Sequence, residues 1–211
     1  YSHLKKTNAL LLLDVTQSLG VIPVNMNDAD FVVCSSYKWL LAFHGVGILG
    51  INPARTKHIE SSLVGWRSIT DMFSPTRFER FRLAEDASRF ELGYPSYPTL
   101  YALNFTSKLI LQIGQERIQK HVIALGDLMI EGLKSLDYEI MTPTDAARRA
   151  GNISIVCADG ERVAEELLRD HIYVWGGDGR LRASLHLFND ASDVEIYIHH
   201  LSQRRKPSMG G

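Results

Sequence analysis

A carboxylate and an amine follow two apolar runs that are typical of buried strands. Asp14 ends the apolar run of residues 9–14, and Lys38 follows a second run at 30–34 after a short polar connection. In an open α/β sheet, ligands bind beyond the carboxyl ends of the strands, so we expect both side chains to reach one crevice. A desolvated lysine loses its proton more readily and can act as an amine nucleophile. Taken alone, Lys38 would be interpreted as a side chain that extends to solvent; its pairing with Asp14 favours chemistry.

Four short segments occur in order along the chain. They are Asp14-Val-Thr-Gln17-Ser-Leu-Gly20, then Ser35-Ser-Tyr37-Lys38-Trp-Leu with Gly45-Val-Gly47, then Arg89-Phe-Glu-Leu-Gly93-Tyr-Pro95, and finally Leu181-Arg182-Ala-Ser184-Leu-His-Leu-Phe188-Asn189. Together they resemble the class V aminotransferase superfamily of pyridoxal-phosphate enzymes, which includes cysteine desulfurases, isopenicillin-N epimerase-like proteins and kynureninase. One such segment would be weak evidence. Four in order, spread over nearly the whole chain, are specific because each supplies the context for the others.

The resemblance implies an α/β protein of fold type I with pyridoxal 5'-phosphate as its cofactor and an amino acid as its substrate. The chain would comprise the later part of the large cofactor-binding domain, followed by a small α+β domain. By this resemblance Lys38 is the catalytic residue, which forms the internal aldimine and then moves the proton at the substrate α-carbon. Asp14 would pair with the pyridine nitrogen and keep it protonated, which improves the ring as an electron sink.

The same resemblance implies further contacts. Gln17 would bind the phenolic oxygen of the cofactor, Ser35 and Tyr37 its phosphate, and Arg182 the substrate carboxylate, which a planar guanidinium can hold with two hydrogen bonds. The family often has His where this chain has Tyr37, but a phenol can also donate to phosphate. Plainer explanations exist: Gln17 would cap a helix, Ser35 would be an ordinary strand end, and Arg182 would pair with a structural carboxylate.

Fold type I enzymes build their pockets at a dimer interface, so the resemblance also implies a homodimer. Tyr94 and Ser96 lie in a Gly/Pro-rich turn cluster before a long helical pattern. Turn residues near these positions reach the phosphate of the neighbouring subunit in related enzymes. Tyr94 and Ser96 are therefore candidates for that contact.

The cysteine positions bear on the reaction. Desulfurases place a nucleophilic cysteine in the loop before the carboxylate-binding arginine, but no cysteine follows Cys157, which lies in an expected strand. Because the persulfide step needs a thiolate, we expect a class V aminotransferase and not a cysteine desulfurase. The alternatives are an epimerase or lyase with the same cofactor, or a non-catalytic binding or assembly protein that retains the fold. A nucleotide-binding domain is disfavoured, because no glycine-rich phosphate motif follows the first strand.

Composition excludes several classes of protein. The 211 residues carry a net charge of −1, which argues against a nucleic-acid partner, and no apolar run approaches the roughly 18 residues that would span a membrane. His199 and His200 lack the carboxylate or cysteine spacing of a metal site, so we expect no metal.

No signal segment follows Tyr1, which favours a cytoplasmic protein. Because the chain begins with Tyr rather than Met, in what resembles the end of a helix, we expect further sequence upstream.

The elements that must position these residues can be read from hydrophobic periodicity. We expect buried strands at 9–14, 30–34 and 46–51. Two helices should follow, separated at Gly114. We assign residues 1–98 to the large domain, 99–136 to an interdomain helical region and 137–211 to the small domain. In the small domain we expect strands at 152–157, 172–175 and 181–188 and helices at 161–169 and 192–201.

Overall fold

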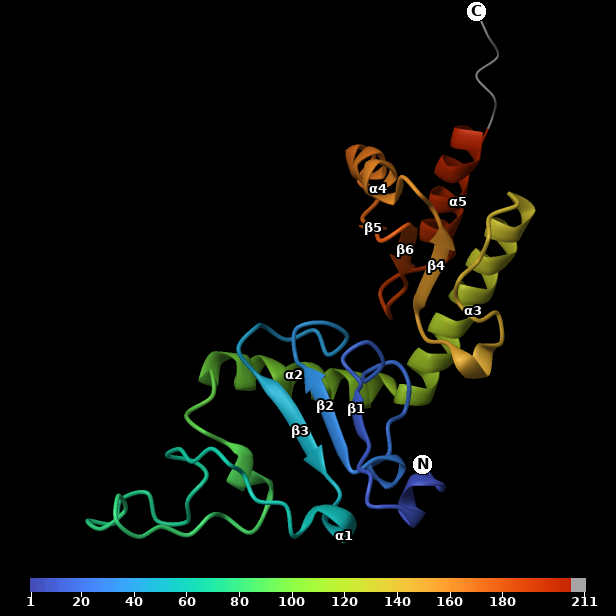
Figure 1. Cartoon of the computed structure of the whole chain (residues 1–211). Helices are drawn as coiled ribbons and strands as arrows, with labels where there is room; N and C mark the ends of the chain where they lie inside the picture. Colours follow the sequence, from blue (N-terminus) through green and yellow to red (C-terminus); the bar gives the residue numbers. More distant parts are fainter. Residues whose placement is uncertain (206–211) are drawn as a thin grey trace, which may run out of the picture. The chain divides into compact units, whose positions relative to one another are not determined.

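The computed structural model of the protein describes residues 1–205, and the chain divides into two compact units, Tyr1–Gln112 and Ile113–Gly211 (Figure 1). The expected α/β architecture is confirmed. Within the described residues, no helix combines the length and apolar character that a bilayer-spanning segment needs.

The first unit contains a three-stranded sheet in the order β1-β2-β3. Its strands are β1 (Leu12–Asp14), β2 (Phe31–Ser35) and β3 (Gly47–Ile51). β1 and β2 run parallel, with Asp14 opposite Val33, whereas β3 is antiparallel to β2. The carboxyl ends of β1 and β2 therefore meet at one edge of the sheet. Helix α2 (Tyr97–Ile113) runs behind the sheet in Figure 1.

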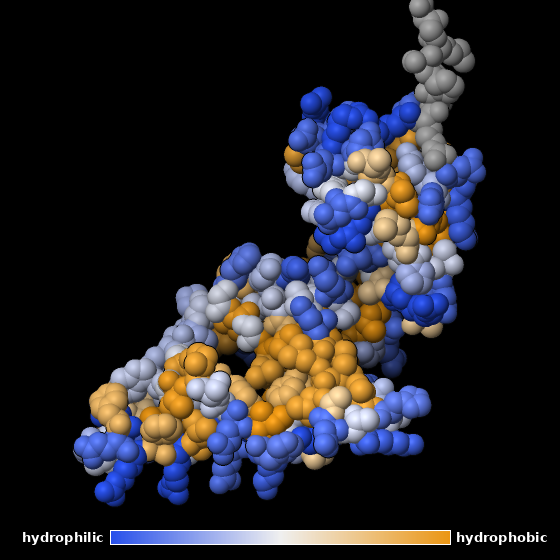
Figure 2. Space-filling view, viewed as in Figure 1, coloured by the Kyte–Doolittle hydropathy of each residue, from blue (hydrophilic) through white to orange (hydrophobic). Residues whose placement is uncertain are grey.

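The prediction that residues 9–14 form a strand buried on both faces was wrong. Only Leu12–Asp14 is strand, and the side chains of Leu10 and Leu12 are 42% and 56% exposed. Alternate residues of a strand point to opposite faces, and Leu12 lies opposite Phe31 on the face away from α2. No helix of the first unit covers this face, which Figure 2 shows as an apolar surface over β1–β3. The apolar run is thus explained by a sheet face that is open in this chain.

The rest of the first unit is mostly turns. Its short helical elements are η1 (Leu4–Lys6), η2 (Met26–Asp28), α1 (Pro53–Thr56) and η3 (Ala87–Phe90). The predicted separation of two helices is confirmed, because α2 ends at Ile113 and α3 begins at Gln115. The residue between them, Gly114, has φ +95°, a conformation that side chains disfavour within a helix.

Asp30 is a fully buried carboxylate that ties the chain before β1 to the sheet. It accepts hydrogen bonds from the Tyr1 hydroxyl and from the Leu11 backbone N–H, and it pairs with Arg55 Nε at 3.3 Å. Burial by itself would raise the pKa of Asp30, but these hydrogen bonds and the Arg55 charge outweigh burial and lower it. A carboxylate with a lowered pKa stabilises the fold above its unfolded-state pKa, and this contribution is lost as the pH falls through the folded-state value.

Replacing Asp30 by Asn is therefore expected to reduce the free energy of unfolding at pH 7 by about 2 kcal/mol, since hydrogen bonds to a charged group are lost. The deficit relative to wild type should shrink as the pH falls below the ordinary Asp pKa of about 3.9, because the unfolded chain then gains a proton that the folded carboxylate resists. Urea unfolding at pH 7 and pH 3 measures both values. Asp28→Asn, at an exposed position nearby, is the matched control; a deficit of equal size at both pH values would contradict the assignment.

The second unit contains an antiparallel sheet in the order β4-β6-β5. One face is packed: Ile153, Ile155, Leu181 and Ala183 are buried there. The opposite face carries Arg180 and Arg182. The elements are α3 (Gln115–Ser135), η4 (Ala146–Arg148), β4 (Asn152–Val156), α4 (Gly160–Arg169), β5 (Trp175–Gly177), β6 (Arg180–Ser184) and α5 (Ala191–Arg205).

Two expected strands of this unit are shorter in the structure. Residues 172–174 are not strand, because Ile172 N–H bonds the Leu167 carbonyl and His171 takes φ +61°, which together close the end of α4. Likewise β6 ends at Ser184 rather than at residue 188. Apolar residues before β5 and after β6 suggested longer strands, but these residues lie outside the sheet.

Candidate active site

Asp14 and Ser35 are brought together by Thr16, at the carboxyl ends of β1 and β2. Asp14 Oδ1 accepts a hydrogen bond from Thr16 N–H at 2.9 Å, and Thr16 Oγ1 accepts one from Ser35 N–H at 3.0 Å. Thr16 is buried, so this link is shielded from water. Sequence reasoning missed Thr16. A signal was present, since an Asp side chain often bonds the backbone two residues later.

The carboxylate of Asp14 is held in its ionised form. Its hydrogen bonds with Thr16 lower the pKa of Asp14, and the positive charge of Lys38 lowers it further. Burial opposes these effects without overcoming them. The shared site predicted for Asp14 and Lys38 stays a prediction.

A cavity of about 400 Å³ lies beside this carboxylate. Its lining residues come from all three strands and are Asp14, Thr16, Val33, Cys34, Ser35, Gly47, Ile48 and Leu49. Gln17, Tyr37 and Lys38 do not line this cavity but lie in the connections that follow β1 and β2. The structure thus separates the predicted residues into two groups, one on the cavity wall and one on the adjoining loops.

The two loops are fastened to each other. Trp39 Nε1–H donates to Gln17 Oε1 at 2.8 Å, and the indole is buried. Gly20 takes φ +102°, and a Cβ built there would lie 2.8 Å from the Trp39 carbonyl oxygen, so glycine permits this close approach. Gln17 does not cap a helix, because turns follow β1. Its amide is instead oriented by Trp39, the residue next to Lys38.

An aromatic pair flanks the lysine on the other side. The rings of Tyr37 and His44 stack with centroids 3.8 Å apart, and Lys38 Nζ lies 5.7 Å from the Tyr37 ring centroid. Thr99 Oγ1–H donates to the His44 carbonyl, which anchors this turn to α2. Ser96 shares a hydrogen bond of 2.9 Å with the Thr99 hydroxyl. No pattern in the sequence indicated that His44 would stack on Tyr37.

Tyr94 lies in the turn before α2 and is exposed. Its hydroxyl is 3.6 Å from Met72 Sδ, and the Arg67 guanidinium lies over its ring at 5.8 Å. The exposed ring leaves a surface for a partner. The phosphate contact predicted for Tyr94 and Ser96 stays a prediction.

Arg182 projects from β6 in the second unit. Its guanidinium lies 5.1 Å from the Trp175 ring, and its Nε is buried without a hydrogen-bond partner. Among residues 1–205, no carboxylate forms an ion pair with Arg182. The guanidinium is supported by an aromatic face instead.

Neither cysteine has the environment of an activated thiol. Burial and the neighbouring Asp14 charge raise the pKa of Cys34, and burial with the Asp159 contact raises the pKa of Cys157. A reactive cysteine requires the opposite shift. In the part of the chain that the structure describes, no three His, Cys, Asp or Glu side chains are grouped to hold a metal ion.

Comparison with known proteins gives one consistent result. A family model described as Aminotransferase class-V matches residues 1–197. A probable cysteine desulfurase of Pyrococcus abyssi is 28% identical, over 92% of this chain and 52% of that protein. A kynureninase of Xanthomonas axonopodis pv. citri is 29% identical, over 88% of this chain and 47% of its own length. The chain thus spans about half the length of the curated relatives that it matches.

The fold agrees with the sequence match. The apo structure of a cysteine desulfurase from Thermococcus onnurineus NA1 has a TM-score of 0.85 against this chain at 26% identity, covering 96% of this chain and 54% of that one. The family match covers both units of the fold. The chain therefore belongs to the class V aminotransferase family, whose cofactor is pyridoxal phosphate.

Proposed function

We propose that the protein is a pyridoxal-phosphate-dependent enzyme that acts on an amino acid, with Lys38 as the attachment point of the cofactor. The observation that carries this proposal is the placement of Asp14 and Ser35 on the wall of one cavity at the carboxyl ends of β1 and β2, with Lys38 in the connection that follows β2. A carboxylate and an amine suit the opposite ends of a pyridine aldehyde.

The residues present fit this cofactor. Asp14 offers an anion for a protonated ring nitrogen, and Ser35 places a hydroxyl on the wall of the same cavity. The stacked Tyr37 and the nearby Lys38 add a phenol and an amine. Each group that pyridoxal phosphate presents thus has a chemically matched partner.

The role of each side chain follows from its chemistry. Lys38 Nζ holds the cofactor covalently and moves the proton at the substrate Cα. Asp14 holds the proton on the ring nitrogen, the Gln17 amide donates to the phenolic oxygen, and Ser35 and Tyr37 donate to the phosphate. When bound, pyridoxal phosphate supplies an electron sink for the charge that develops at Cα.

The proposal extends to the assembly. Residues 1–98 belong to the large cofactor domain, 99–136 to an interdomain region and 137–211 to the small domain. The enzyme acts in the cytoplasm as a homodimer, and Tyr94 or Ser96 contacts the phosphate bound by the neighbouring subunit. The exposed ring of Tyr94 supports this assignment.

Cleavage of a side-chain bond is the reaction class that the relatives' names favour, since both a desulfurase and a kynureninase match the chain. The desulfurase reaction itself receives no support from this chain, because the pKa of each cysteine is raised. We therefore assign a lyase-type reaction that uses no protein thiol. Transamination is the second candidate, favoured by the description of the family model.

Absorbance and product analysis test the proposal. The full protein with added pyridoxal phosphate is expected to show a visible absorbance band that Lys38→Ala removes. With amino acid substrates, a side-chain fragment released together with alanine, or together with pyruvate and ammonia, indicates a lyase, whereas stoichiometric transfer of the amino group to a keto acid indicates an aminotransferase. A wild-type protein that stays colourless with excess cofactor would support a non-catalytic binding protein instead.

Arg182 should act on substrate binding. Arg182→Lys keeps the charge but loses the planar two-point contact, so KM for the amino acid is expected to rise about 10- to 100-fold, with a smaller change in kcat. Steady-state kinetics measure both constants. Arg169→Lys, at an exposed position on α4, is the matched control. An unchanged KM in Arg182→Lys would remove Arg182 from the site.

A further inference from the structure

The open face of the β4-β6-β5 sheet carries two arginines on one aromatic ring. Arg180 and Arg182 are two residues apart on β6 and therefore point to the same face. Each guanidinium lies 5.1 Å from the Trp175 ring centroid. Trp175 is paired with Arg182 across the strands, so this cluster is built by the sheet itself.

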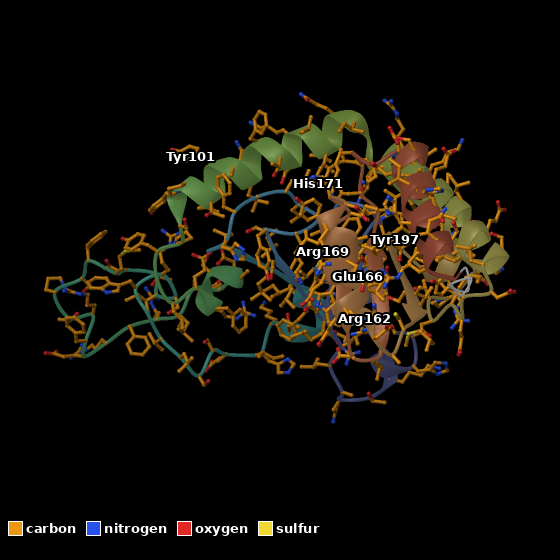
Figure 3. The ribbon with its side chains drawn as sticks, turned by 90° about the horizontal axis from the view of Figure 1, so that it is seen from above. Tyr101, Arg162, Glu166, Arg169, His171 and Tyr197 are labelled. Carbon is orange, nitrogen blue, oxygen red and sulfur yellow. The ribbon has the colours of Figure 1, made fainter. Side chains whose placement is uncertain are left out.

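The two guanidinium groups are poorly neutralised. Nε of Arg180 and Nε of Arg182 are both buried without hydrogen-bond partners. Elsewhere in this unit, Arg162 on α4 meets two carboxylates: it pairs with Glu166 on the same helix, which Figure 3 labels beside it, and with Asp159, which immediately precedes α4. The Arg180–Arg182 cluster is thus a concentration of positive charge and unused donors.

Among the described residues, Asp178 is the carboxylate that forms an ion pair with this cluster. It lies 3.3 Å from Arg180 in the turn between β5 and β6, and its side chain is 76% exposed. Exposed pairs of this kind contribute little, because water screens the charges and both side chains lose freedom. A ligand carboxylate can therefore displace Asp178 from Arg180.

We infer that Arg180 is a specificity-determining residue that binds the second carboxylate of a dicarboxylic amino acid, while Arg182 binds the first. That the ligand is an amino acid rests on the proposed function. That the site binds a dianion rests on the Arg180–Arg182 cluster alone. Guanidinium groups bind carboxylates with paired charge-assisted hydrogen bonds, and the Trp175 face keeps the two groups in place. A neutral side chain carries no charge that could replace Asp178 at Arg180, which disfavours it.

Trp175 provides a direct readout. The full protein is titrated with glutarate and with butyrate at constant ionic strength, and tryptophan fluorescence is followed; Trp175→Phe identifies the signal among the three tryptophans. Glutarate is expected to bind more tightly than butyrate. Arg180→Gln should raise the Kd for glutarate about tenfold or more and leave that for butyrate unchanged, whereas Arg182→Gln should raise both.

Asp178→Asn tests whether misfolding explains the losses. This variant should lower the Kd for glutarate, and damage to the fold would not increase affinity. Arg169→Gln controls for general loss of positive charge.

Equal Kd values for glutarate and butyrate, or an Arg180→Gln protein with wild-type affinity for glutarate, would overturn the inference. If glutarate binds as expected but the cofactor does not attach to Lys38, the dianion site stands and the proposed function fails. In the active enzyme, Arg180→Gln should lower kcat/KM about tenfold for acidic substrates alone.

Discussion

Replacing Lys38 by alanine is expected to abolish turnover, with kcat reduced by at least about 10³-fold. In the proposed function the amine supplies both the covalent attachment and the base that moves the proton at Cα, and positioned bases alone contribute about 10² to 10⁴. The charge of Lys38 reaches Asp14, so the same change should also weaken cofactor binding. Single-turnover kinetics with saturating cofactor separate the two effects.

Two controls make this result specific. Lys57→Ala removes an exposed lysine of the same unit and should leave kcat unchanged. A small primary amine in solution should restore part of the activity of Lys38→Ala, because it can replace the missing base. A Lys38→Ala protein that retains more than a tenth of wild-type kcat would contradict the role assigned to Lys38.

Replacing Asp14 by Asn is expected to lower kcat/KM by about 10²- to 10³-fold. Asn keeps the shape and can still accept the Thr16 hydrogen bond, so the change removes charge and little else. Loss of one partner of a hydrogen-bonded charge pair costs about 2–5 kcal/mol, which is the source of this range. Kinetics at saturating cofactor, with the visible spectrum as a second readout, measure the effect.

The pH dependence of Asp14 has a definite sign. Because Thr16 and the Lys38 charge lower the pKa of Asp14, the carboxylate stays ionised throughout the range from pH 5 to pH 8. Titration of Asp14 should therefore cause no fall in wild-type activity between pH 8 and pH 5. Any fall in this range should also occur in Asp14→Asn. An acid limb in this range that Asp14→Asn abolishes would refute the assignment. Asp71→Asn, at an exposed site in the same unit, is the matched control.

The order of strands and helices was predictable because each depends on local periodicity. Asp14 and Ser35 end strands that pair in parallel, so their meeting at one sheet edge follows from sequence. Gly114 separates two helices for a local reason, its positive φ. The exposure of Leu10 and Leu12 was not predictable, since periodicity reports that a face is apolar but not whether another element covers it.

Side-chain contacts between distant loops could also not be predicted from the sequence. Trp39 meets Gln17 through a close approach at Gly20, and His44 stacks on Tyr37 after a turn. Trp175 supports Arg182 because β5 and β6 pair in one particular register. Each contact depends on how loops and strands are placed in three dimensions, which residue types alone do not determine.

We propose that Lys38 and Asp14 hold one cofactor between them. Borohydride reduction of the full protein with pyridoxal phosphate, followed by peptide mass spectrometry, tests it directly. We predict that the cofactor mass is found on the peptide containing Lys38, is absent in Lys38→Arg and falls in Asp14→Asn at limiting cofactor. Attachment spread equally over exposed lysines such as Lys57, or equal labelling of wild type and Lys38→Arg, would contradict the account.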